Sequence, residues 1–174
     1  MKALRISCAL ALLSVTMSGC SVRSSQLSGI LEVFQASTEN YMDSAWLIRY
    51  GDYRAQVQAL PFEGGVLFSN REGDQLYFNG WTITRASGLG TLRGRWSVYD
   101  DSRGRHFTKR NRRTTFPSCS AWQSLTVRGV TEYTQTCPGA NDYENSILVN
   151  SEGEITLIRQ SLSGGSSFVT LSKL

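Results

Sequence analysis

Few residues in this chain could carry out chemistry. The 174 residues contain a single histidine, His106, so any serine, threonine or cysteine nucleophile would have only this imidazole as its base. His106 lies among basic residues, which is typical of an exposed loop histidine rather than of a base oriented by a carboxylate. One histidine also cannot build a histidine-rich zinc site. We therefore predict no nucleophilic catalysis, no metal and no other cofactor.

Two further motifs allow a chemical interpretation that their surroundings do not favour. Asp100 and Asp101 form an adjacent carboxylate pair, and two carboxylates can hydrolyse a glycosidic bond. They stand at a turn, however, where adjacent side chains rarely face one substrate. Residues Gly88–Gly94 (GLGTLRG) are similar to a nucleotide-binding loop, but the last glycine comes one residue late and no helix is expected after it. We expect turn and strand-edge glycines there, and no enzyme activity.

A basic stretch between Arg93 and Arg113 is the strongest charge feature. It holds eight Lys or Arg residues against Asp100 and Asp101, a local net charge of +6. Arginine presents forked donors to carboxylates and phosphates, so this stretch predicts binding of an anionic polysaccharide, a lipid headgroup or an acidic partner. The alternative is a solvated hairpin, neutralised if it meets the acidic residues of 142–154. The candidate anionic-ligand patch comprises Arg93, Arg95, Arg105, Lys109, Arg110, Arg112 and Arg113.

Residues 1–19 have the organisation of a secretory signal peptide. Lys2 and Arg5 precede the apolar run Ile6–Val15, which is too short to span a bilayer. The run leads to Ser18-Gly19-Cys20, which resembles the lipobox of bacterial lipoproteins, where the cysteine is acylated after cleavage. We therefore expect Cys20 to be lipidated and to hold the protein to membrane lipid, followed by a tether over residues 20–26.

The residue after the lipidated cysteine bears on the compartment. Ser21 stands there instead of Asp, which by resemblance to proteobacterial lipoprotein sorting favours the outer membrane over the inner one. The predicted location is the periplasmic face of the outer membrane. An exported protein does not meet nucleic acid, so we expect no nucleic-acid partner for the basic stretch.

Cysteine usage agrees with export. Cys8 leaves with the signal and Cys20 carries lipid, so Cys119 and Cys137 remain as a pair. We predict one disulfide between them, closing a loop of about 18 residues and contributing roughly 3 kcal/mol. Two buried free thiols are the alternative.

The elements that position these residues are mainly strands. Residues Tyr53–Ala59 alternate in polarity, and Asn79-Gly80 lies between two aromatic and β-branched runs, which predicts a two-residue hairpin turn. Turn signals every 8–12 residues or so predict an antiparallel β-sandwich or partly open barrel. This single β-rich domain covers residues 27–174 and begins with a short amphipathic helix at Leu27–Phe34. Further predicted strands are Gly65–Ser69, Leu92–Tyr99, Thr114–Phe116, Ser124–Val130, Glu132–Cys137, Ser146–Val149, Glu154–Gln160 and Phe168–Ser172.

Four tryptophans offer flat apolar surfaces on which sugar rings could stack. In a β protein of this size most tryptophans belong to the core or its margin, and we expect that placement here. The four are Trp46, Trp81, Trp96 and Trp122.

Two segments resemble the YjbF/GfcB family of capsule- and exopolysaccharide-associated bacterial lipoproteins. Residues Leu76–Leu89 are similar to a hairpin of that family, and Ile147–Leu162 to its strand-turn-strand unit, within a similarity that extends from about Glu39 to Lys173. The resemblance implies a non-catalytic accessory lipoprotein of capsule or exopolysaccharide assembly or export, with polysaccharide or envelope export proteins as partners. The alternative is an envelope scaffold that binds another protein and has no connection with glycan; a glycan hydrolase is the third choice.

Overall fold

The computed structural model describes residues 45–90 and 94–174 of the chain, and there it is built of β-strands with no helix. The predicted all-β antiparallel fold class is therefore confirmed. The predicted signal peptide, the predicted lipidation site Cys20, the predicted tether and the predicted helix at Leu27–Phe34 lie outside the described residues. No helix of the described part is long and apolar enough to cross a membrane. The strands are β1 (Ala45–Tyr50), β2 (Tyr53–Phe62), β3 (Gly65–Ser69), β4 (Gln75–Phe78), β5 (Ile83–Ser87), β6 (Arg95–Asp101), β7 (Gly104–Lys109), β8 (Arg112–Phe116), β9 (Gln123–Val127), β10 (Val130–Cys137), β11 (Tyr143–Val149), β12 (Ile155–Ser161) and β13 (Phe168–Lys173).

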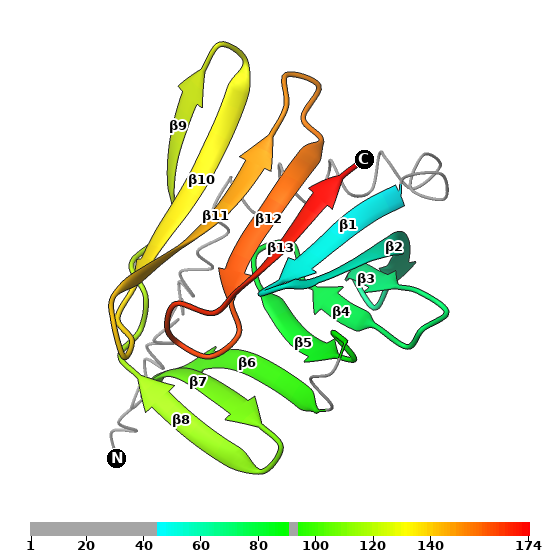
Figure 1. Cartoon of the computed structure of the whole chain (residues 1–174). Coiled ribbons are helices and arrows are strands. Elements are labelled where there is room, and N and C mark those ends of the chain that lie inside the picture. The colour runs from blue at the N-terminus through cyan, green and yellow to red at the C-terminus, as the bar shows by residue number, and fades with distance from the viewer. Residues whose placement is uncertain (1–44, 91–93) are drawn as a thin grey trace, which may run out of the picture.

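All thirteen of these strands form one sheet, in the order β8-β7-β6-β5-β4-β3-β2-β1-β13-β12-β11-β10-β9. Strands β1 and β13, the first and last along the chain, are neighbours in the middle of this order, with Trp46 opposite Lys173 and Tyr50 opposite Val169. The sheet curls so that the wall made by β2–β8 faces the wall made by β9–β13 and β1 (Figure 1). Because β8 and β9 are the two ends of this order, the described sheet is a partly open barrel rather than a two-sheet sandwich.

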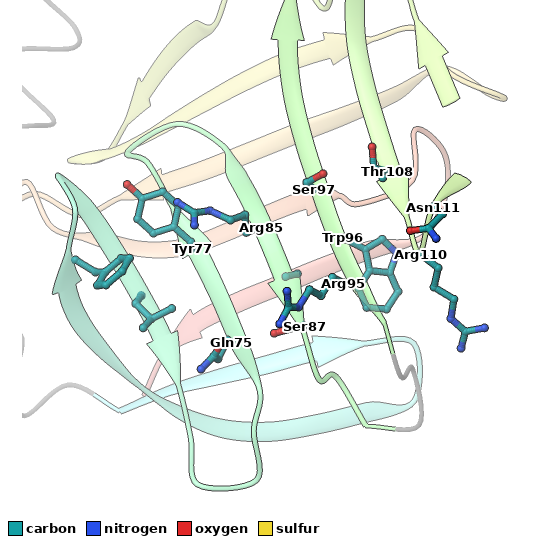
Figure 2. A pocket seen from close by; sticks show the side chains of 13 residues that line it. Gln75, Tyr77, Arg85, Ser87, Arg95, Trp96, Ser97, Thr108, Arg110 and Asn111 are labelled. Carbon is teal, nitrogen blue, oxygen red and sulfur yellow. The ribbon is translucent and has the colours of Figure 1, made fainter. Parts of the chain in front are cut away.

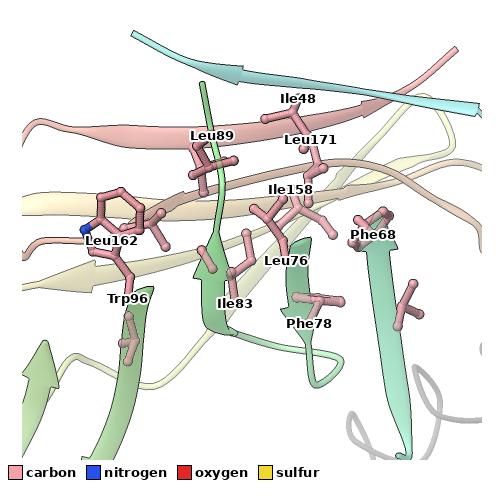
Figure 3. Packing of buried hydrophobic residues seen from close by; sticks show 14 of the residues in the cluster. Ile48, Phe68, Leu76, Phe78, Ile83, Leu89, Trp96, Ile158, Leu162 and Leu171 are labelled. Atoms are coloured by element: carbon pink, nitrogen blue, oxygen red, sulfur yellow. The ribbon is translucent and has the colours of Figure 1, made fainter. Parts of the chain in front are cut away.

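The apolar core lies between these two walls. Along strands such as β1, β3 and β4 alternate residues point inward, so Phe68 and Leu76 from one wall pack toward Ile48, Ile158 and Leu171 from the other (Figure 3). All five side chains are at most 1% exposed. Full burial of an apolar side chain of this size contributes about 1.5–3 kcal/mol, so this interior is the main source of stability.

A buried glutamine connects the two walls. The side chain of Gln160 on β12 is 2% exposed. Its Oε1 accepts a hydrogen bond of 2.7 Å from the backbone N–H of Ile83, and its Nε2 donates one of 2.5 Å to the carbonyl of Trp81. Both partners belong to the β4–β5 hairpin, so Gln160 fixes that hairpin against the opposite wall.

The β4–β5 hairpin is confirmed, but its predicted two-residue turn is wrong. Phe78 lies opposite Ile83, which leaves four residues, Asn79–Thr82, in the connection. The side-chain Oδ1 of Asn79 accepts hydrogen bonds from the backbone N–H of Trp81 (3.0 Å) and Thr82 (2.8 Å). This local capping by the asparagine stabilises a longer turn than the Asn-Gly pair alone predicts.

The predicted disulfide joins Cys119 to Cys137. It ties the segment before β9 to the end of β10, and the backbone N–H of Ser120 adds a 2.8 Å hydrogen bond to the carbonyl of Thr136. The loop that begins at Pro117 is therefore held against the sheet at two neighbouring points.

The glycine-rich loop after β5 encloses a carboxylate of the chain itself. Gly88, Leu89 and Gly90 all have left-handed backbone angles, with φ of 82°, 56° and 68°. The N–H of Leu89 donates a 2.6 Å hydrogen bond to Oδ1 of Asp74, which is 2% exposed, and Tyr53 donates one of 2.5 Å to Oδ2. A Cβ at Gly88 would lie 2.7 Å from Asp74. The turn-glycine interpretation is confirmed for Gly88 and Gly90, while residues 91–93 of the motif lie outside the described residues.

Candidate functional site

The outward face of β3–β7 carries a row of polar and apolar side chains. Register places Leu67 opposite Tyr77, Tyr77 opposite Arg85, Arg85 opposite Ser97, and Ser97 opposite Thr108. These five residues alternate with the inward-pointing core residues, so they cross five strands on the face turned away from the core.

A cavity of about 650 Å³ lies over this row. A second row borders it, in which Gln75 is opposite Ser87 and Ser87 is opposite Arg95, and the β7–β8 turn adds Arg110 and Asn111 (Figure 2). We call this cavity the arginine groove. Its lining residues are Phe62, Leu67, Gln75, Tyr77, Arg85, Ala86, Ser87, Arg95, Trp96, Ser97, Thr108, Arg110 and Asn111.

The lining of the arginine groove is cationic. Arg85, Arg95 and Arg110 contribute guanidinium groups from β5, β6 and the β7–β8 turn, and the lining contains no Asp or Glu. Arg85 lies 4.8 Å from the centre of the Tyr77 ring, and its Nη2 is 3.3 Å from Oε2 of Glu63 at the rim. Both partners of that ion pair are about 60% exposed, and surface pairs of this kind contribute little to stability.

The turn that carries Arg110 has an unusual backbone. Arg110 and Asn111 join β7 to β8 as a two-residue connection, and both have positive φ, 49° and 119°. The N–H of Arg110 donates a 3.3 Å hydrogen bond to the carbonyl of Arg95, which places the turn beside the groove. An arginine in the left-handed backbone conformation costs about 1–2 kcal/mol, which an Asn-Gly pair in the same turn would avoid. Backbone strain of this kind clusters at functional sites.

One member of the predicted basic patch is not on the surface. Arg105 is 3% exposed, and its guanidinium makes two parallel hydrogen bonds of 2.9 Å to the carboxylate of Asp100. Its Nη1 also lies 3.3 Å from Oε1 of Gln135. The prediction that Arg105 binds an external anion is therefore wrong, because the preceding strand supplies its counter-ion.

The expectation of an exposed loop histidine is also wrong. His106 lies on β7 and is 2% exposed. Its Nε2 is 2.8 Å from Oδ1 of Asp101, and its Nδ1 is 2.8 Å from both Thr115 Oγ1 and Arg113 Nη2. Tyr99 covers the ring at a centroid distance of 4.7 Å. Since arginine can only donate, Nδ1 is the acceptor and Nε2–H donates to Asp101.

Asp101, His106 and Thr115 are hydrogen-bonded in the sequence carboxylate–imidazole–hydroxyl, as in the catalytic triad of a hydrolase. The imidazole Nδ1, however, has a second partner here. The Arg113 guanidinium already holds the imidazole lone pair that a threonine nucleophile would need. Arg113 also lies 5.2 Å from the centre of the Tyr99 ring. The arrangement therefore orients Arg113 on the outward face next to the arginine groove.

Asp100 and Asp101 do not form a carboxylate dyad. Asp100 pairs with Arg105, whereas the neighbouring Asp101 pairs with His106 and with Arg103, whose Nη2 is 3.0 Å from its Oδ2. Both lie on β6 rather than at the predicted turn, and consecutive strand residues point to opposite faces, which separates the two groups. The hydrogen bond from His106, with two more from Arg103, holds the pKa of Asp101 well below its usual range.

The remaining members of the basic patch occupy different places. Lys109 lies 5.2 Å from the centre of the Trp96 ring, and Arg112 is exposed on β8 opposite Lys109. Arg93 lies outside the described residues. Within the described ranges no ion pair joins Lys109 or Arg112 to the acidic residues of 142–154, and Glu154 pairs instead with Lys173 at 3.0 Å. Of the predicted patch, the groove therefore retains Arg95 and Arg110.

Sequence reasoning missed Arg85, the third arginine of the groove. It lies in the recognised β4–β5 hairpin, and its cross-strand pairing with Tyr77 is the signal that could have found it. The four tryptophans follow the expectation. Trp46 and Trp96 are 2% exposed, while Trp81 and Trp122 pack on the core margin with ring centroids 5.3 Å apart.

No protein-family model, curated protein or solved structure matches this chain. Within the described residues, no three His, Cys, Asp or Glu side chains gather as the ligands of a metal ion would.

Proposed function

We propose that this chain is a lipid-anchored, non-catalytic accessory protein of capsule or exopolysaccharide assembly or export, held at the periplasmic face of the outer membrane. The observation that carries the proposal is the arginine groove, in which three arginines and no acidic residue line a cavity of about 650 Å³. This volume lies within the range of about 300–1,000 Å³ typical of ligand sites.

The groove chemistry fits an acidic sugar polymer. Guanidinium forks match carboxylate groups in two contacts, and the hydroxyls of Ser87, Ser97 and Thr108 can exchange hydrogen bonds with sugar hydroxyls. Tyr77 and Phe62 add aromatic surface at one end, with ring centroids 5.9 Å apart. A polymer needs an open site that it can enter from the side, and these residues lie on an outward strand face.

The envelope location is supported by two features of the chain. The lipobox-like Ser18-Gly19-Cys20 follows a short apolar run, and the Cys119–Cys137 disulfide suits an oxidising compartment. The resemblance to capsule-associated lipoproteins agrees with the same location. The absence of a free imidazole base near the groove favours a binding role over a hydrolytic one.

Gene deletion and complementation test this proposal. Deleting the gene in its native host is expected to reduce surface polysaccharide, with wild type restoring it and Arg95→Gln/Arg110→Gln failing to do so. Cys20→Ala is expected to leave the protein unprocessed or released from the membrane fraction. The matched control Arg49→Gln/Arg71→Gln removes two exposed charges that do not line the groove and is expected to restore the polymer fully.

Normal surface polysaccharide in the deletion strain would contradict the proposal and favour the scaffold alternative. Normal membrane fractionation of Cys20→Ala would contradict the lipid anchor, irrespective of the groove.

A further inference from the structure

Strand β9 is a free edge of the described sheet. It pairs with β10 on one side, through Gln123–Val127 opposite Val130–Thr134, and it ends the strand order on the other. All five of its residues are exposed. Figure 1 shows the β9–β10 hairpin extending away from the curled body. The outer side of β9 therefore presents unpaired backbone N–H and C=O groups within the described part of the chain.

The two edges of the sheet differ in charge. β8, at the other end, carries Arg112 and Arg113, and charged side chains on an edge oppose the addition of another strand. β9 has the sequence QSLTV, without a charged residue or a proline. Its composition favours pairing, since β9 itself carries neither of the two residue types, charged residues and proline, that protect an edge.

Exposed apolar side chains lie on one face of this hairpin, together with Glu132, which is opposite Leu125. Leu125 is 66% exposed, Val127 56% and Val130 43%. Val127 lies opposite Val130, and Leu125 lies two residues away on the same face of β9. An exposed edge strand that carries no charge and has apolar side chains favours association with another strand.

We propose that a second copy of this chain pairs its own β9 with this one, antiparallel and centred on Leu125. Such a twofold arrangement puts Leu125 opposite Leu125 of the copy, Ser124 opposite Thr126, and Gln123 opposite Val127. Every facing pair is uncharged, so the edge is complementary to itself, and cross-strand apolar contact adds to the backbone hydrogen bonds.

The charged β8 edge explains why pairing stops at two copies. A head-to-tail contact would join β8 of one copy to β9 of the next and continue without limit. The charges of Arg112 and Arg113 oppose the addition of a strand at β8. A β9–β9 contact uses the same surface twice and closes on itself. This inference goes beyond the proposed function and does not depend on glycan binding.

Cysteine cross-linking tests the register. In the full-length protein in its native membranes, Leu125→Cys is expected to form a disulfide-linked dimer on mild oxidation, because opposite Cβ atoms lie about 4.5–5.5 Å apart. Thr114→Cys, exposed at the middle of the other edge, is the matched control and is expected to remain a monomer. Co-expressed Ser124→Cys and Thr126→Cys chains are expected to give a mixed dimer.

Charge insertion tests the same contact without cysteine. Leu125→Lys places two like charges opposite each other, so the purified protein is expected to change from twice the chain mass to the single chain mass in sedimentation. Thr114→Lys is expected to leave the dimer intact. A monomeric wild type without Leu125→Cys cross-linking would overturn the proposal. So would a cross-link to another protein, or a Leu125→Lys variant that keeps its mass but loses binding to phospholipid vesicles.

Discussion

Arg105 and Asp100 face each other across β6 and β7 with two parallel hydrogen bonds, Nε to Oδ1 and Nη2 to Oδ2, both 2.9 Å long. The guanidinium is 3% exposed, whereas the carboxylate is 48% exposed. The charge of the buried Arg105 on β7 is thus neutralised by a half-exposed carboxylate. This pairing makes Arg105 different from the exposed arginines of the basic stretch.

Asp100→Asn is expected to lower the free energy of unfolding by about 1–3 kcal/mol, because Arg105 would be left buried without a counter-charge. Urea denaturation measures the change. Asp142→Asn, an exposed carboxylate replaced in the same way, is the control and is expected to stay within about 0.5 kcal/mol of wild type. Equal stabilities of the two variants would contradict the assignment.

Stability in acid is expected to depend on Asp101. Its pKa is lowered in the folded protein, first by the hydrogen bond from His106, from an ordinary value of 3.8. A carboxyl group with a lowered folded pKa contributes stability that is present above its unfolded pKa and is lost as pH falls toward the folded one. As pH falls below about 4, the free energy of unfolding of wild type should therefore decrease toward that of Asp101→Asn. A constant difference between the two across this window would contradict the prediction.

The elements with local signals could be predicted from the sequence. Gly65–Ser69 is β3 as expected, and the disulfide followed from counting cysteines and assigning two of them to the signal and the lipid. Strand β7 was not recognised, because Arg105 and His106 in consecutive positions look like a solvated loop. Their burial depends on Asp100 and Asp101 in the preceding strand, and a local pattern does not contain that pairing.

The site was predictable only in part for the same reason. Arg95 and Arg110 were selected by charge density, but the groove also needs Arg85, which register brings beside them from another hairpin. The pairing of β1 with β13 joins the two ends of the described chain, and no local pattern specifies it.

Gln160→Leu is expected to lower the free energy of unfolding by about 2–4 kcal/mol, because the N–H of Ile83 and the carbonyl of Trp81 would both lose their partner inside the barrel. Gln58→Leu, on the exposed side of β2, is the matched control and is expected to be nearly neutral. Thermal and urea denaturation of both variants measure this, and a neutral Gln160→Leu would show that the glutamine does not connect the walls.

Arg110→Asn is expected to raise the free energy of unfolding by about 1 kcal/mol while weakening the binding of acidic polysaccharide, since asparagine tolerates a left-handed backbone but carries no charge. Asn111→Gly relaxes the same turn and keeps Arg110, so it is expected to be stabilising with binding retained. Loss of stability in Arg110→Asn would refute the idea that the turn is strained to hold the arginine.

The arginine groove is tested most directly by calorimetric titration of the purified protein with oligogalacturonate, an acidic sugar chain, against neutral dextran. We predict binding of oligogalacturonate alone, and weakening as salt rises from 0.1 M to 1 M, because the Debye length falls from about 10 Å to about 3 Å. Arg95→Gln/Arg110→Gln is predicted to weaken the affinity at least about tenfold, which corresponds to 1.4 kcal/mol, while Arg49→Gln/Arg71→Gln leaves it unchanged. Equal binding of dextran, or equal affinities of the two double variants, would contradict an anionic-glycan site in the groove.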